Sequence, residues 1–400
     1  MKPVQLHPLS LVTGALLVGA ALALSSMQQL SGKRFQLLSA QEKAVLSHMS
    51  IVYIDDGHGT QLETLRIRDV NLQLVNGAGS TQSVNGLGNL IIGYVEDGNP
   101  LGDERTGSHN LVTGARNSYS SYGGVVAAYQ NAISGPYSSV LGGHTNHASG
   151  TYASVAGGEL NEAVADYSNV TGGKLNLALG SHAHVSGGVE NIAYSHESAI
   201  LGGRENEVSG ANGHGVVCGG RYNDASGDYA VVGGGIQNTA SGNYSVIDGG
   251  SGNSTLSYAS VVGGGVGNTS SGHESVVNGG ANNTASGDYS VVAGGESNQA
   301  SGSYTSVSGG KLNFVSGAHS HISGGVQNTV GSHESAILGG RNNEVSGPAG
   351  HGVVCGGRFN STTGDYAVVS GGLNNSTTHD HSTVSGGCSL SSVAACSHTP

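Results

Sequence analysis

One spacing dominates this chain of 400 residues. Asparagine recurs every 15 residues, with two steps of 17, at positions 131, 146, 161, 176, 191, 206, 223, 238, 253, 268, 283, 298, 313, 328, 343, 360 and 375. A Gly-Gly pair keeps the same phase from Gly142-Gly143 to Gly386-Gly387. A fixed period is typical of solenoids, in which each repeat contacts only its neighbours. The sequence therefore predicts one long stack of short coils rather than a globular domain.

The columns of the repeat can be assigned to the inside or the outside of a coil, because residues two apart share one face of a β-strand. The residue two before each Gly-Gly pair is Val or Ile, from Val140 to Val384, and the residue two earlier is small. We expect these columns and the asparagine column to face inward, with each Asn amide bonded to its equivalents in the coils above and below. This pattern predicts an all-β, single-chain parallel β-solenoid, or β-roll, of 15-residue coils with two short strands per coil. At about 4.8 Å per coil, seventeen coils would make a rod about 80 Å long.

A second, longer period lies on top of the first. The segment His196-Glu197-Ser198-Ala199-Ile200-Leu201-Gly202-Gly203-Arg204 recurs from His333 to Arg341, at an offset of 137 residues. This offset equals eight coils of 15 residues and one of 17. A block of nine coils is therefore duplicated within the chain.

The amino-terminal residues read as an export signal. Lys2 precedes an apolar run from Leu9 to Leu24, and small residues such as Ala23 and Ser25 offer cleavage sites. We assign residues 1–25 to a signal peptide, with an uncleaved membrane anchor as the alternative. Either interpretation predicts an exported protein that is extracellular or held at the cell surface.

Four further segments follow the signal. Ser39-Ala40-Gln41-Glu42 has capping-box spacing and predicts a short helix within a segment of residues 26–50. Residues 51–116 are expected to form an amino-terminal cap and irregular coils, with a hairpin turn at Asp55–Gly59. The regular solenoid should then span residues 117–387, and residues 388–400 should form a carboxy-terminal cap or tail.

The repeat unit has a known counterpart. Units such as Val277-Asn278-Gly279-Gly280-Ala281-Asn282-Asn283-Thr284-Ala285-Ser286-Gly287 resemble the head repeats of YadA-like (Hep/Hag-type) trimeric adhesins, over about residues 86 to 387. The resemblance implies a left-handed β-roll, a homo-oligomer that could be a trimer, and binding to a surface. The coiled-coil stalk and membrane barrel of those adhesins have no counterpart here, so we do not expect self-anchoring.

Composition and resemblance together suggest a function. The chain has 14 Lys and Arg against 26 Asp and Glu, a net charge of −12, which excludes nucleic acid as a partner. We expect a non-catalytic rod that acts as an adhesin-like binding module for a surface glycan or protein, without a cofactor. The alternative is a self-assembling structural component of the envelope or extracellular matrix. An enzyme acting on polysaccharide is a distant third interpretation, because a 15-residue coil leaves no room for a substrate groove.

Histidine supplies the sharpest candidate for a metal site. His182 and His184 are two residues apart on an expected outward strand, and Glu197 takes the position of His182 one coil later. Two imidazoles and a carboxylate are a ligand set that zinc accepts. The duplicate offers His319, His321 and Glu334. The alternative is that these are solvated surface side chains.

The four cysteines fall into two groups. Cys218 and Cys355 occupy equivalent outward sites nine coils apart, too far for a disulfide between them, so they are free or pair between chains. Cys388 and Cys396 lie beyond the last regular coil. In an exported protein these two could form a disulfide that closes a small loop at the end of the rod.

One outward column suggests an interface. Immediately before the core Val or Ile, six successive coils carry a second valine, at Val216, Val231, Val246, Val261, Val276 and Val291. The strand propensity of valine offers a simpler explanation. However, six stacked valines would form an apolar strip about 25 to 30 Å long, which soluble monomers seldom leave uncovered. We therefore expect a second copy of the chain, or another partner, to cover this strip.

Overall fold

The computed structural model describes residues 38–399, which fall into two units divided between Gln73 and Leu74. In the first unit, helix α2 (Ala40–Ser47) begins at a capping box between Ser39 and Glu42, as predicted. Strands β1 (Met49–Asp55) and β2 (Gln61–Ile67) pair antiparallel, and the expected hairpin turn joins them. In the second unit, an irregular loop of residues 76–89 hydrogen-bonds to the first coil, where the Asn85 backbone N–H donates to Ser108 Oγ.

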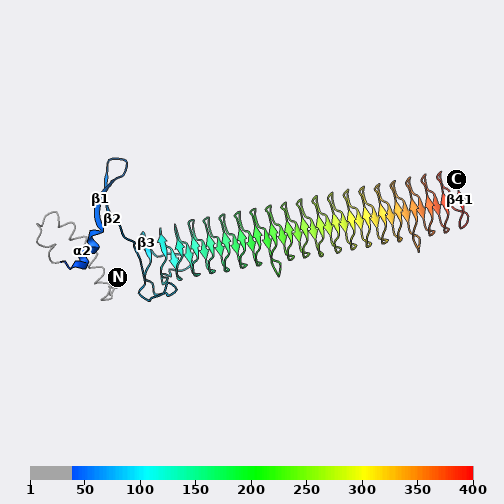
Figure 1. The fold of residues 1–400 in the computed structure, drawn as a ribbon. Helices are drawn as coiled ribbons and strands as arrows, with labels where there is room; N and C mark the ends of the chain where they lie inside the picture. The colour runs from blue at the N-terminus through cyan, green and yellow to red at the C-terminus, as the bar shows by residue number, and fades with distance from the viewer. Residues whose placement is uncertain (1–37, 400) are drawn as a thin grey trace. The chain divides into compact units, whose positions relative to one another are not determined.

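The second unit is a parallel β-solenoid of about 19 turns, as the spacing predicts. Two ladders of short parallel strands run along it (Figure 1). The first ladder contains β3 (Leu90–Ile92), β4 (Leu111–Thr113), β6 (Val125–Val126), β8 (Ser139–Val140), β10 (Ser154–Val155), β12 (Asn169–Val170), β14 (His184–Val185), β16 (Ala199–Ile200), β18 (Val216–Val217), β20 (Val231–Val232), β22 (Val246–Ile247), β24 (Val261–Val262), β26 (Val276–Val277), β28 (Val291–Val292), β30 (Ser306–Val307), β32 (His321–Ile322), β34 (Ala336–Ile337), β36 (Val353–Val354), β38 (Val368–Val369), β40 (Thr383–Val384) and β41 (His398–Thr399).

The second ladder faces the first across the core. It contains β5 (Ser118–Tyr119), β7 (Ala132–Ile133), β9 (His147–Ala148), β11 (Glu162–Ala163), β13 (Leu177–Ala178), β15 (Ile192–Ala193), β17 (Glu207–Val208), β19 (Asp224–Ala225), β21 (Thr239–Ala240), β23 (Ser254–Thr255), β25 (Thr269–Ser270), β27 (Thr284–Ala285), β29 (Gln299–Ala300), β31 (Phe314–Val315), β33 (Thr329–Val330), β35 (Glu344–Val345), β37 (Ser361–Thr362) and β39 (Ser376–Thr377). The residue after each Gly-Gly pair adds a third ladder of single-residue bridges, which the sequence did not predict.

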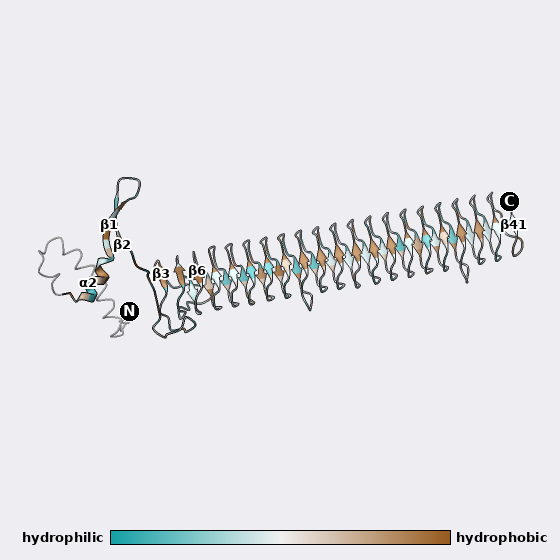
Figure 2. Ribbon diagram, in the orientation of Figure 1, coloured by the Kyte–Doolittle hydropathy of each residue, from teal (hydrophilic) through white to brown (hydrophobic). Residues whose placement is uncertain are grey.

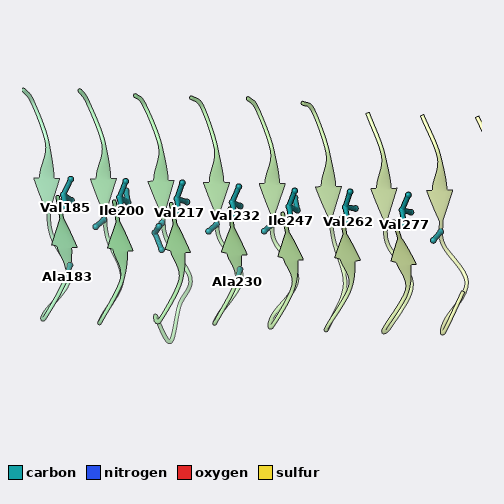
Figure 3. Packing of buried hydrophobic residues seen from close by; sticks show 14 of the residues in the cluster. Ala183, Val185, Ile200, Val217, Ala230, Val232, Ile247, Val262 and Val277 are labelled. Atoms are coloured by element: carbon teal, nitrogen blue, oxygen red, sulfur yellow. The ribbon is translucent and has the colours of Figure 1, made fainter. Parts of the chain in front are cut away.

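The interior is a thin column of Val, Ile and Ala, one layer per coil. The Val or Ile that ends each strand of the first ladder is fully buried from Val126 to Val384, and successive members pair in register. Figure 3 shows this column over seven coils, and in Figure 2 many strands of the rod are coloured as hydrophobic. The predicted strand phase is therefore confirmed.

The asparagine column forms a buried ladder that also explains the Gly-Gly pairs. The backbone N–H of Asn283 donates to Oδ1 of Asn268, and its Nδ2 donates to the carbonyls of Gly279 and Gly295. The second glycine of each pair has positive φ, and a Cβ on Gly280 would lie 2.2 Å from the Gly295 carbonyl oxygen and 2.6 Å from Asn283 Nδ2. The predicted amide ladder is present, but most side-chain amide donors go to glycine carbonyls rather than to the next amide.

Each coil turns through non-glycine residues in the left-handed region. Tyr244, for example, has φ of 60°, a conformation that costs roughly 1 kcal/mol per residue. Its N–H points along the rod and donates to the Asp228 carbonyl one coil earlier, at 2.8 Å. A hydrogen bond between coils thus offsets the strain in every turn.

The carboxy-terminal residues continue the solenoid instead of forming a separate cap or tail. β41 pairs in register with β40, and the Cys396 N–H donates to the Asp380 carbonyl one coil earlier. Leu390 occupies the asparagine column, where its N–H donates to Oδ1 of Asn375 and its side chain packs against the core. One further coil therefore follows the last Gly-Gly pair.

Asp224 is a strand residue whose carboxylate is only partly hydrogen-bonded. Asp224 in β19 lies beside Glu207 of the previous coil, and its Oδ1 is buried with no hydrogen-bond partner. Burial, and then the charge of Glu207, raise the pKa of the Asp224 carboxyl. The charged form therefore destabilises the native state at neutral pH.

We expect Asp224→Asn to raise the melting temperature at pH 7. A group whose native pKa is raised lowers stability at any pH above that pKa, so the gain should shrink as the pH falls and vanish below the ordinary Asp range near 4. Melting of both proteins between pH 3.5 and 7.5 would test this. A gain that grows on acidification would contradict it. Asp248→Asn, at an exposed site, is the control.

Candidate functional site

A continuous column of aromatic rings follows one corner of the solenoid. It runs from Tyr122 to His381, with neighbouring ring centroids 4.3 to 6.3 Å apart. Many rings are near-parallel, as in the pair Tyr229 and Tyr244, which lie 4.8 Å apart at 2°. Most members occupy the left-handed position of the turn before a strand of the first ladder. The regular spacing of these Tyr and His residues is visible in the sequence. The sequence analysis expected His182 on an outward strand, so it did not predict that the rings stack at a turn.

The column is not interrupted where the left-handed residue lacks a ring. Glu197, Ala259, Glu274 and Glu334 occupy that position in four coils. In each of these coils the preceding residue provides the ring: His196, Tyr258, His273 or His333. Neighbouring rings stack face to face along parts of the column and meet edge to face elsewhere, as do His182 and His196 at 89°.

The predicted metal ligands are not brought together. His182 lies in the turn, not on a strand, and stacks on Tyr167 at 4.7 Å. His184 lies on β14, and its Nε2 contacts Ser186 Oγ at 2.8 Å. In the duplicate, His319 stacks on Tyr304, while His321 contacts the hydroxyls of Ser306 and Ser323. Burial lowers the pKa of His321.

The two glutamates of those sets instead contact other histidines. Glu197 Oε1 lies 3.3 Å from His196 Nε2, and Oε2 lies 3.0 Å from His214 Nδ1. Glu334 contacts His333 and His351 in the same way, both at 3.1 Å. Within residues 38–399, no three His, Cys, Asp or Glu side chains are placed to hold one metal ion.

The two 17-residue coils carry longer loops, visible as projections on one side of the rod in Figure 1. In the first, the N–H and side-chain amide of Asn212 donate to the Asp228 carboxylate, and these hydrogen bonds lower its pKa. In the second, the N–H groups of Ala349 and Gly350 donate to Asp365. An aspartate one coil later therefore fixes each loop.

Arginines gather at the Gly-Gly corner of these same coils. Arg204 and Arg221 are bridge partners in adjacent coils, as are Arg341 and Arg358, and all four are exposed. Arg221 lies over the ring of Tyr222 at 4.6 Å, and Arg358 lies over Phe359 at 5.0 Å. The sequence reading did not single out these arginines.

All four cysteines are free and exposed, so the predicted disulfide between Cys388 and Cys396 is absent. Both residues take regular places in the added coil. Cys388 is the bridge residue after Gly-Gly, paired with Leu373, and Cys396 lies at the left-handed position of the aromatic column. Cys218 and Cys355 each follow a core valine.

The valine strip lies where the sequence placed it. The six valines are partly exposed and pair in register, from Val216 with Val231 to Val276 with Val291. The strip is therefore a continuous outer row on the first ladder.

Over residues 38–399 no helix is both long and apolar enough to cross a membrane, and the apolar run of the expected export signal lies outside the described residues. Neither a family model nor a curated protein sequence matches the chain.

Proposed function

We propose that this chain is a non-catalytic, exported rod whose outer columns form a repeated binding surface, in the manner of an adhesin head. The observation that supports this proposal is that some columns of the repeat stack the coils while others face outward. The Val or Ile, Asn and second Gly columns stack the coils, while outward sites on the first ladder before the valine strip differ from coil to coil, as at Ser154, Asn169 and His184. The resemblance to YadA-like head repeats and the expected signal peptide support the same function.

The mature protein should bind surfaces that display its receptor. Labelled protein can be applied to glycan arrays and to host or bacterial cells, with an unfolded core variant as the control. Cell fractionation should recover the chain outside the cytoplasm, shortened by about 23 to 25 residues if the signal is cleaved. Recovery of a full-length cytoplasmic protein that binds no surface would rule out this function.

Self-assembly into a structural layer is the second candidate, and the valine strip favours it. Six in-register valines on the outer face would be covered if a second copy packed against the first. Light scattering at high micromolar concentration and negative-stain microscopy would show such assemblies.

Replacing Val231, Val246, Val261 and Val276 together with Thr should disperse any such assembly while the fold is retained. Threonine keeps β-branching and shape but adds hydroxyl groups to the strip. Circular dichroism provides the folding control. A wild type that is already monomeric, or a variant that assembles as well as wild type, would show that the strip is not an interface.

A further inference from the structure

The two duplicated blocks of the chain are much more similar in one segment than in the segments on either side of it. Residues 195–221 are identical to residues 332–358 at 24 of 27 positions. The preceding segments, 166–194 and 303–331, agree at 15 of 29 positions. The following ones, 222–237 and 359–374, agree at 9 of 16. The two blocks have diverged around a retained segment, so recent copying does not explain that segment.

Part of the retained segment does not serve the fold. Its Gly, Asn and buried Val or Ile residues are needed to stack coils, but the arginine pairs are exposed. Like charges on directly paired strand positions repel each other. Both blocks nevertheless keep two arginines in adjacent coils. The chain has only 14 basic residues, which makes this repetition more notable.

Acidic partners within the chain do not explain why the arginines are retained. Arg204 Nε contacts Glu205 at 2.8 Å, and its NH2 group lies 4.0 Å from Glu190. At the equivalent positions the second block has Asn342 and Gln327, so Arg341 has kept its place without either acid. The retained feature is the pair of guanidinium groups, not an ion pair.

Two lysines in the same column differ from the arginines, because each has a glutamate partner in both blocks. Lys174 and Lys311 also follow Gly-Gly pairs. Each contacts a glutamate one coil earlier, Lys174 with Glu159 at 3.1 Å and Lys311 with Glu296 at 2.7 Å. Where a basic residue of this column forms an ion pair within the chain, its glutamate partner is therefore present in both blocks.

The surroundings of the arginine pairs are open to a ligand. A Cβ added to Gly202, Gly219, Gly339 or Gly356 would meet no atom within 4 Å, so the backbone two residues before each arginine is open. The aromatic rings under Arg221 and Arg358 hold one member of each pair by cation–π contact. A planar guanidinium fork matches the oxygens of carboxylate and sulfate groups.

We propose that each arginine pair binds a carboxylate or sulfate group of an acidic glycan. This inference rests on the proposed function as a binding rod and specifies its ligand class. The two pairs lie nine coils, or about 43 Å, apart on the same corner. A linear polymer with repeated acidic groups can engage both pairs at once, which raises its apparent affinity over that of a single group.

The experiment compares three acidic polymers and a neutral one on the mature chain by isothermal titration calorimetry at low salt. Polygalacturonate carries carboxylates, dextran sulfate carries sulfates, poly-glutamate is an acidic peptide, and dextran is neutral. We expect at least one acidic glycan to bind, dextran not to bind, and binding to weaken as salt is added. Which glycan binds distinguishes carboxylate from sulfate. Binding of poly-glutamate alone would overturn the assignment to a glycan.

Paired variants locate the site. Arg341→Gln with Arg358→Gln should weaken glycan binding at least tenfold. Arg204→Gln with Arg221→Gln should weaken it less, because Glu190 and Glu205 already compete for Arg204. The control, Lys174→Gln with Lys311→Gln, removes the same charge from the same column and should leave affinity within about twofold. Equal losses for the lysine and arginine variants, or none, would overturn the proposal.

Failure of this inference can be told apart from failure of the proposed function. If the chain binds cells or neutral glycans and the arginine variants bind equally well, the proposed binding function is supported and the proposal of an acidic glycan ligand is wrong. If wild type binds no surface and no polymer, both proposals are wrong.

Discussion

Val292→Asp is expected to unfold the solenoid or to break it open around β28. Val292 is fully buried and pairs in register with Val277 and Val307. A carboxylate at this site would lie in a narrow core of Val, Ile and Ala, with no cation to pair with it. Burial of an unpaired charge costs several kcal/mol, which is comparable to the stability of a typical domain. Thermal unfolding by circular dichroism and hydrogen exchange across the neighbouring coils would measure the effect.

Val291→Asp is the matched control, because it puts the same charge one residue away on the outer face. Val291 is partly exposed and lies on the valine strip. Its replacement should leave the melting temperature of a monomer within a few degrees of wild type. Equal destabilisation by the two variants would show that the strand phase is wrong.

Asn283→Ala should produce the second large loss of stability. The side chain donates to the carbonyls of Gly279 and Gly295, and its Oδ1 accepts from the Asn298 N–H at 3.0 Å. Alanine leaves the Gly279 carbonyl and the Asn298 N–H without these partners, while the Gly295 carbonyl still accepts from the Ala281 N–H. Each unsatisfied group costs about 1 to 3 kcal/mol, so the total should reach several kcal/mol. Denaturant unfolding of the purified chain provides the measurement.

Asn282→Gly tests whether this loss is specific to the buried ladder. Asn282 is exposed and has φ of 55°, a conformation that glycine adopts freely. Its replacement should change stability by less than about 1 kcal/mol. If Asn283→Ala is as mild as Asn282→Gly, the amide ladder does not hold the coils together.

The stacking of the coils could be predicted because the residues that make it recur at a fixed period. Inward positions accept a narrow range of side chains, and a 15-residue period repeats that requirement along the chain, as at Val277 and Asn283. The segments Asn89–Gly93 and Asn110–Gly114 are also similar in sequence, and their strands β3 and β4 pair in register. Short sequence motifs were enough to predict the helix cap at Ser39 and the hairpin turn.

The surface was harder to predict because its geometry depends on turns. Alternation assigns faces only within strands, whereas His182 lies in a left-handed turn whose direction the period does not reveal. The pairing of Glu197 with His196 and His214 depends on that turn, so the predicted ligand set with His182 and His184 does not form. The last coil was missed for a related reason, since Leu390 replaces the expected Asn and hides the repeat.

The direction of the hydrogen bonds between coils has a mechanical consequence. These bonds run along the rod, as between the Tyr244 N–H and the Asp228 carbonyl, so a pulling force along the rod would load them one coil at a time. A freed 15-residue coil can extend to about 50 Å of contour, whereas it occupies only about 5 Å in the stack. Under tension the rod would lengthen by peeling, in steps of about 45 Å, and absorb work at each step while the remaining coils stay intact.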